Sequence, residues 1–199
     1  MRLVALLFLL LVLGGSQAKP KPTEGSAVSP LVAADFVRRC CRWTRYPRVC
    51  VSTLLPCAPA VGRSPRRLAR AALVVGADRA GNCSSYLRVS GAAVSLGGGA
   101  IKDCKEMVRD AEERLRQSAA EMERMGRAGS PRFAWSLSNV QTWASAALTD
   151  TSTCLDSLSQ AQAHGDNKDD AVRRRVVAVA QATSNALALV NKLDRRLYL

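Results

Sequence analysis

The feature that most constrains the fold is a pair of cysteines placed symmetrically about one break in a long helical stretch. The segment Gly126–Pro131 is rich in residues that break helices, and Cys104 and Cys154 lie equally far in sequence from Gly129 within it. Two helices that reverse direction there bring both cysteines to the same height, because every helical residue adds the same rise of about 1.5 Å. A disulfide needs Cα atoms about 4.4 to 6.8 Å apart. The spacing therefore predicts a helical hairpin joined by a structural disulfide, not a reactive thiol site.

Apolar residues recur at spacings of three and four over most of the chain, which is typical of amphipathic helices. Serine followed by proline, a signature of a helix start, occurs at Ser64-Pro65 and again at Ser130-Pro131. These patterns predict an all-α fold, an up-down-up-down four-helix bundle preceded by a helical hairpin. We expect the hairpin over about Ser29–Pro56 and the four bundle helices from Pro65 to a stop at Gly97–Gly99, over Ala100–Met125, from Pro131 to just before His164, and over Asp169–Leu197.

The first residues predict secretion. Arg2 precedes an apolar run over Leu3–Leu13, and small residues follow up to Ala18, as in a signal peptide. The run is too short to span a bilayer, which takes about 20 residues. We expect a signal peptide over residues 1–18, a disordered leader over 19–30, and one domain over 31–199, with the hairpin at 31–60 and the bundle at 64–199. Secretion permits disulfides.

Four motifs carry a family resemblance. They are Cys41, Thr44, Tyr46, Pro47 and Cys50; Lys102-Asp-Cys104-Lys-Glu106; Asn139 to Thr149 leading to Thr153-Cys154-Leu-Asp156; and Thr183-Ser-Asn-Ala-Leu187. In this order they resemble the plant invertase and pectin methylesterase inhibitor family, over nearly all of the expected mature chain. The stretches Val140–Trp143 and Thr183–Leu187 resemble the pectin methylesterase branch more than the invertase branch.

The resemblance implies disulfides Cys41–Cys50 and Cys104–Cys154, and a secreted protein of the plant cell wall, the apoplast. It implies a stoichiometric, non-covalent inhibitor that caps the substrate cleft of pectin methylesterase. The first alternative is inhibition of cell-wall or vacuolar invertase, because Pro131-Arg132-Phe133 is similar to a tripeptide of invertase inhibitors. The second is a basic wall protein that binds pectate and inhibits nothing. Cys40, Cys57 and Cys83 are additional to the family's four cysteines. They are expected either to be free thiols or to form one extra disulfide among themselves.

No catalytic residue, metal ligand or cofactor is predicted. A hydrolytic triad needs a histidine as base, and the one histidine, His164, lies in a charged turn. The cysteines lack the paired short spacings of a zinc site. The sequon at Asn82 falls inside a predicted helix, so we expect Asn82 to be mostly unmodified. These observations predict a protein that is not an enzyme.

The formal net charge of the chain is +13, and no acidic residue occurs from Phe36 to Ala77. Long-range attraction to a polyanion follows from such an imbalance. In a secreted protein we expect de-esterified pectin, and not nucleic acid, as that polyanion, with Arg63, Arg66, Arg67 and Arg70 as contacts. The alternative is that the arginines only keep the protein soluble.

A second candidate surface lies in the third bundle helix. Between Arg132 and Asp150 the chain has no charged residue. The predicted outer face carries Ser138, Gln141, Thr142, Ser145 and Thr149, flanked by Trp143. Interface cores are poor in charge and rich in aromatic residues, so this face is predicted to bind the partner enzyme. The alternative is that neighbouring helices cover it.

Overall fold

The computed structural model describes residues 28–93, 99–163 and 170–195, and in these ranges the chain is helical and contains no strand. The elements are α2 (Pro30–Cys41), α3 (Pro47–Leu54), the 3-10 turn η1 (Leu55–Cys57), α4 (Ala58–Val61), α5 (Pro65–Ala93), α6 (Gly99–Arg124), α7 (Pro131–Ala163) and α8 (Asp170–Arg195). The predicted signal peptide and residues 19–27 of the predicted leader lie outside the described residues. None of the described helices is long and apolar enough to cross a bilayer.

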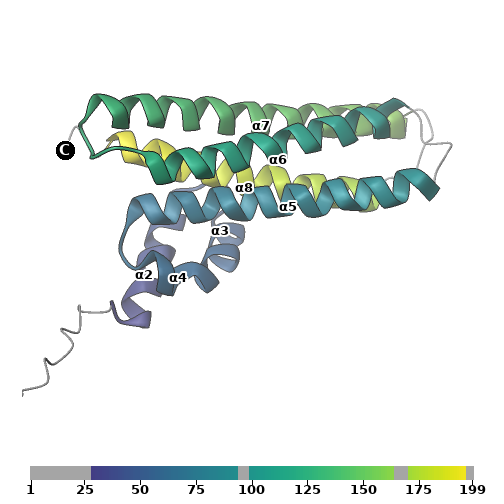
Figure 1. The fold of residues 1–199 in the computed structure, drawn as a ribbon. Coiled ribbons are helices and arrows are strands. Elements are labelled where there is room, and N and C mark those ends of the chain that lie inside the picture. Colours follow the sequence, from purple (N-terminus) through teal and green to yellow (C-terminus); the bar gives the residue numbers. More distant parts are fainter. Residues whose placement is uncertain (1–27, 94–98, 164–169, 196–199) are drawn as a thin grey trace, which may run out of the picture.

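Helices α5 to α8 form the bundle (Figure 1). Each packs against the helix before and after it in sequence, and α8 returns to pack against α5. The all-α class and the bundle topology predicted from the sequence are therefore confirmed. The short helices α2 to α4 lie on the outer side of α5 and α8, towards one end of the bundle.

The two serine-proline signatures begin helices as predicted. Ser64 Oγ accepts a hydrogen bond of 3.3 Å from the amide of Arg67 at the start of α5. Ser130 Oγ accepts one of 3.1 Å from the amide of Phe133 at the start of α7. Each serine satisfies one of the backbone N–H groups that a helix start leaves without an intrahelical partner.

Cys104 and Cys154 form a disulfide between α6 and α7, with Cα atoms 4.7 Å apart. It lies in a hydrophobic cluster at the end of the bundle far from the hairpin, among Cys83, Leu87, Val108 and other buried residues. Helices α6 and α7 therefore reverse direction near Gly129 and bring Cys104 and Cys154 side by side, as the spacing in the sequence predicts. Gly129 itself has φ of +82°, a conformation that favours glycine.

Arg66, near the start of α5, holds the end of α6. Its guanidinium donates to the carbonyl of Met122 at 3.0 and 3.1 Å and to that of Gly126 at 3.2 Å, and it also reaches the carbonyls of Glu123 and Met125. The last carbonyls of a helix lack intrahelical partners and carry partial negative charge, so a cation stabilises them. Arg66 thereby ties the α6–α7 turn to the first turn of α5.

The segment after α3 remains helical. The hairpin helices were predicted to end at about Pro56, within a hairpin segment of 31–60, and the helical path continues through η1 and α4 as far as Val61. Pro56 and Pro59 lie in the first turns of these two short elements, where proline costs no hydrogen bond. The extra turns place Ala58 and Val61 in the core. At the other boundary, α2 begins at Pro30, the last residue of the predicted leader.

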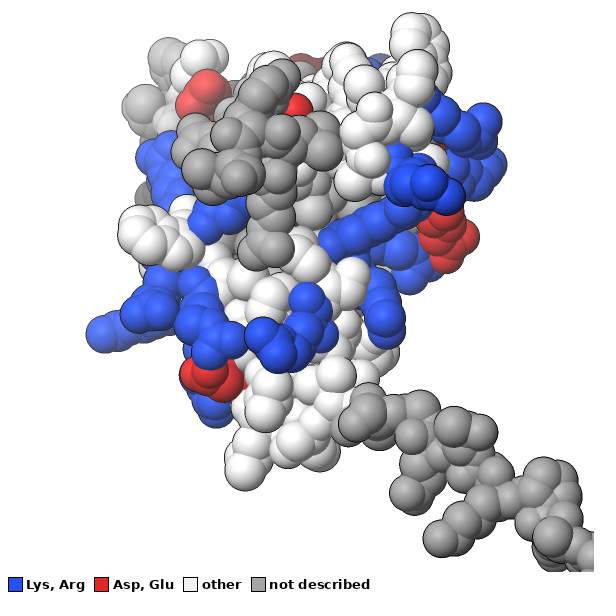
Figure 2. Space-filling view, turned by 90° about the vertical axis from the view of Figure 1, so that its left-hand side faces the viewer, with Lys and Arg blue, Asp and Glu red and all other residues white. Residues whose placement is uncertain are grey.

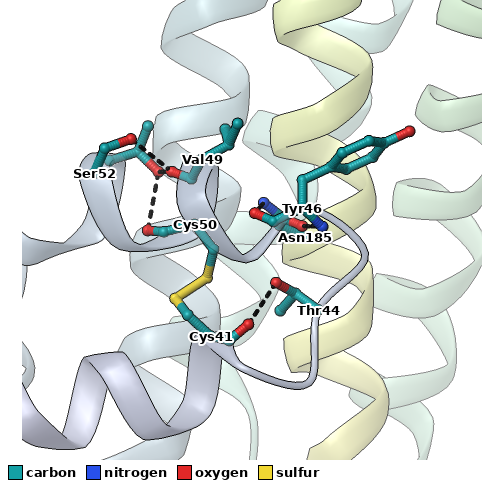
Figure 3. The surroundings of a disulfide bond; sticks show 8 residues. Cys41, Thr44, Tyr46, Val49, Cys50, Ser52 and Asn185 are labelled. Carbon is teal, nitrogen blue, oxygen red and sulfur yellow. Dashed lines mark hydrogen bonds between the residues drawn. A yellow bond between two sulfur atoms is a disulfide. The ribbon is translucent and has the colours of Figure 1, made fainter.

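Two of the sequence motifs meet where the hairpin docks on the bundle (Figure 3). The Cys41–Cys50 disulfide, with Cα atoms 5.6 Å apart, joins α2 to α3. In the turn between them, the amide of Tyr46 donates to Asn185 Oδ1 and its carbonyl accepts from Asn185 Nδ2, both at 3.0 Å. Asn185 points from α8 towards this turn and is only 3% exposed. The asparagine of the last motif thus fixes the first motif to the bundle.

Replacing Asn185 with leucine should lower the free energy of unfolding by about 2 kcal/mol. Both backbone groups of Tyr46 would lose their partner at a part-buried site, and each lost hydrogen bond costs on the order of 1 kcal/mol. Chemical denaturation followed by circular dichroism measures the change. Asn191→Leu is the matched control, because Asn191 is exposed on the same helix and, among the described residues, hydrogen-bonds only to Gln141. Equal losses in the two variants would contradict the docking role of Asn185.

Candidate partner-binding face

The outer side of α7 is exposed along its uncharged stretch. Ser138, Thr142, Ser145 and Thr149 are all exposed, while the positions between them, such as Val140, Ala144 and Ala147, are buried. The alternative that neighbouring helices cover these four residues is therefore wrong. Gln141 is half-buried, and its amide donates to Asn191 Oδ1 of α8 at 3.1 Å. It marks the edge of the face rather than its centre.

Trp135 extends this face by one turn, and the sequence analysis missed it. Its side chain is 69% exposed, an unusual state for a large apolar residue. It lies three residues before Ser138 and hence on the same line of the helix. That spacing could have identified it. We call the exposed line of Trp135, Ser138, Thr142, Ser145 and Thr149 the α7 face.

A polar groove of about 330 Å³ borders the α7 face on the α6 side. Trp143 lines it together with Asp110, Glu113, Arg114 and Gln117 of α6. Beside it, Arg114 Nη1 and Asp150 Oδ2 are 2.5 Å apart and connect α6 to α7. Burial raises the pKa of Asp150 despite the opposing effect of Arg114. Asp150, which ends the uncharged stretch, therefore faces Arg114 between α6 and α7 and does not add a charge to the α7 face.

The four arginines predicted to bind a polyanion have different surroundings. Arg66 caps α6, Arg67 donates to the carbonyl of Ala60 at 3.2 Å, and Arg70 pairs with Glu123. Arg63 is exposed, and within the described ranges it makes no hydrogen bond or ion pair. The structure does not bring the four together as one site, and their role in polyanion binding stays a prediction.

The tripeptide that suggested an invertase inhibitor is part of the start of α7. Pro131 occupies the first turn, Phe133 is buried in the core, and Arg132 Nε donates to the carbonyl of Arg124 at 3.1 Å. These residues join the α6–α7 turn to the bundle. Nothing in their arrangement favours the invertase alternative.

The remaining predicted residues are the three unassigned cysteines, Asn82 and His164. Cys40, Cys57 and Cys83 form no disulfide, and burial raises the pKa of the Cys83 thiol to about 11, which keeps it protonated and unreactive. Asn82 lies within α5, as predicted, and is exposed; that it is mostly unmodified stays a prediction. His164 lies outside the described residues. Among those that are described, no group of three or more His, Cys, Asp or Glu side chains could hold a metal ion.

A sequence model of the family described as plant invertase/pectin methylesterase inhibitor matches residues 35–189, which include both disulfides. The chain belongs to this family. By its family it is an enzyme inhibitor and not an enzyme. The family predicted from the four motifs is confirmed.

Relatives support the assignment over most of the chain. Pectinesterase inhibitor 11 from Arabidopsis thaliana is 37% identical over 93% of this chain and 91% of that protein. Pectinesterase inhibitor 9 from the same plant is 37% identical over 97% and 93%. A crystal structure of a mutant pectin methylesterase inhibitor from Arabidopsis matches 76% of this chain and 92% of its own, with a TM-score of 0.50 and 18% identity. At that identity the structural match supports the fold alone.

Proposed function

We propose that this chain inhibits a plant pectin methylesterase, and that the α7 face contacts the enzyme. Its family membership and the names of its relatives support the enzyme class. The observation that carries the choice of surface is an exposed tryptophan followed by four exposed hydroxyl residues without a charge. An uncharged surface is desolvated at low cost, and tryptophan is among the residues that most often dominate binding energy.

The proposed mechanism is steric. A complex of ordinary size buries about 800 Å² on each partner, which is enough to cover the cleft of an enzyme that acts on a polymer. Since no residue of the inhibitor needs to react, the complex is non-covalent, with one inhibitor per enzyme. We further propose that the protein is secreted and acts in the cell wall, where such an enzyme meets its substrate.

A titration against two enzymes tests this function. The chain from Lys19 onward, refolded with its disulfides, is added to a plant pectin methylesterase and, separately, to a plant acid invertase. We expect the rate of methyl-ester hydrolysis to fall with a break point near one inhibitor per enzyme, while invertase activity stays unchanged. Loss of invertase activity alone would favour the first alternative. Loss of neither activity, across several enzyme isoforms, would contradict an inhibitory function.

A further inference from the structure

A cleft of about 370 Å³ lies where the hairpin meets the bundle. Its residues come from the end of α2, the turn after it, the start of α5 and the end of α8. Phe36, Leu68 and Leu189 line it and are themselves buried, so the floor is apolar. The volume is at the small end of the range for ligand sites, about 300 to 1,000 Å³.

An exposed tryptophan forms part of the rim. Trp43 is 74% exposed and therefore contributes little to the core. Lys192 of α8 lies over its ring, 5.1 Å from the ring centre, and this cation–π contact orients the indole from one side. The rest of the ring is open to solvent beside the cleft. An exposed indole ring is unfavourably hydrated when no ligand is bound, and a ligand that stacks on the ring removes that apolar surface from water.

The charged residues of the cleft are all cations. Arg39, Arg63 and Lys192 line it, and no acidic side chain does. Asp35 does not line the cleft, but it forms an exposed ion pair with the guanidinium of Arg39. Arg63 has no such partner among the described residues. Figure 2 shows Lys and Arg side chains gathered at this end of the molecule, over the hairpin and the bundle, with few acidic side chains among them.

We propose that this cleft binds the carboxylated sugar units of an acidic oligosaccharide. A pyranose ring offers a face of C–H groups, which suits an indole and an apolar floor, and a uronate adds a carboxylate, which suits guanidinium and ammonium groups. A neutral sugar would use the indole and the floor but would bring no anionic group to the cations of the lining. A small inorganic anion would leave the indole and the floor without a contact. Only a ligand with both features uses the whole lining.

This inference adds a ligand to the proposed inhibitor and does not depend on inhibition. A pectin methylesterase produces uronate carboxylates, so the proposed ligand is the product of the enzyme that the chain is proposed to inhibit. The two ideas fail separately, because sugar binding is measured without enzyme and inhibition is measured by titration of the enzyme.

The test is a calorimetric titration of the mature chain with a short oligogalacturonide, beside its fully methyl-esterified form. We expect saturable binding of the acidic form and at least about tenfold weaker binding of the ester. Trp43→Ala, and separately the double variant Arg63→Gln/Lys192→Gln, should each weaken binding about tenfold or more. Trp43 and Arg63 are exposed and Lys192 is half-buried, so these variants are expected to fold; circular dichroism verifies this.

Matched controls separate the cleft from the charge of the whole molecule. Arg48→Gln/Arg174→Gln removes two exposed positive charges elsewhere, and Trp135→Ala removes an exposed indole on α7; both should bind the oligogalacturonide as the parent chain does. Equal weakening by the control pair, or equal binding of polyglutamate, would show that net charge alone attracts the sugar and would overturn the site. Equal binding of acid and ester would overturn the role of the carboxylate.

Discussion

Replacing Cys104 and Cys154 together by alanine is expected to lower the free energy of unfolding by about 4 kcal/mol. The disulfide closes a loop of 50 residues, and the loss of chain entropy that it imposes on the unfolded state grows with loop length. Thermal and chemical unfolding under non-reducing conditions measure the effect. A domain has only about 5 to 15 kcal/mol of stability to lose, so the variant should be partly unfolded at raised temperature.

Both cysteines have to be replaced, because Cys83 lies in the same hydrophobic cluster. A single replacement would leave a new thiol beside the buried Cys83 thiol and risk a different bridge. The matched control is Cys41→Ala/Cys50→Ala, which opens a loop of 9 residues and should cost only about 2.5 kcal/mol by the same relation. If the shorter loop proved the more costly one to open, the entropic account would be wrong.

Thr142→Glu should weaken inhibition of pectin methylesterase at least tenfold while leaving the melting temperature nearly unchanged. Thr142 is exposed in the middle of the α7 face, so the free protein tolerates a charge there. In a complex the carboxylate would be desolvated without a partner, which costs several kcal/mol, and a tenfold loss needs only about 1.4 kcal/mol. Ser145→Lys tests the same face with the opposite charge and should have a similar effect.

Val89→Glu is the control for this experiment. Val89 is a β-branched residue that is 71% exposed on α5, and α5 packs against α6 and α8 rather than α7. The variant carries the same new charge away from the α7 face and should inhibit like the parent chain. If both Thr142→Glu and Ser145→Lys inhibit normally, the contact surface lies on another helix. If Thr142→Glu weakens inhibition and Ser145→Lys does not, the charge of the enzyme surface, and not the cost of desolvation, accounts for the loss.

The helices and their order could be predicted because the signals are local. Ser64-Pro65 and Ser130-Pro131 begin helices through hydrogen bonds within three residues. The spacing of apolar residues predicts which side of each helix is buried, and the same reasoning predicted the exposed line of the α7 face. Trp135 lies at the spacing of that exposed line, so the same pattern could have predicted it, whereas Trp143, which was predicted to flank the face, is half-buried.

The features that could not be predicted from the sequence join residues far apart in the chain. Nothing local marks Asn185 as the partner of the Tyr46 backbone, which it meets across 139 residues. Arg66 looked like one member of a basic cluster, but it caps a helix that ends 58 residues later. The cleft beside Trp43 exists only because α2, α5 and α8 converge there. Such arrangements depend on how finished helices pack, and single-sequence patterns do not encode that packing directly.

The order in which the helices pack around the bundle places the two proposed binding surfaces on different helices. The hairpin packs on α5 and α8, and in Figure 1 α7 runs along the side of the bundle away from the hairpin. A partner on one side leaves the other side open, so a chain that binds both can hold an enzyme and an acidic polymer simultaneously. Attachment to the polymer would raise the local concentration of the inhibitor wherever carboxylates accumulate. Inhibition would then be strongest in the regions of the wall that the enzyme has already de-esterified.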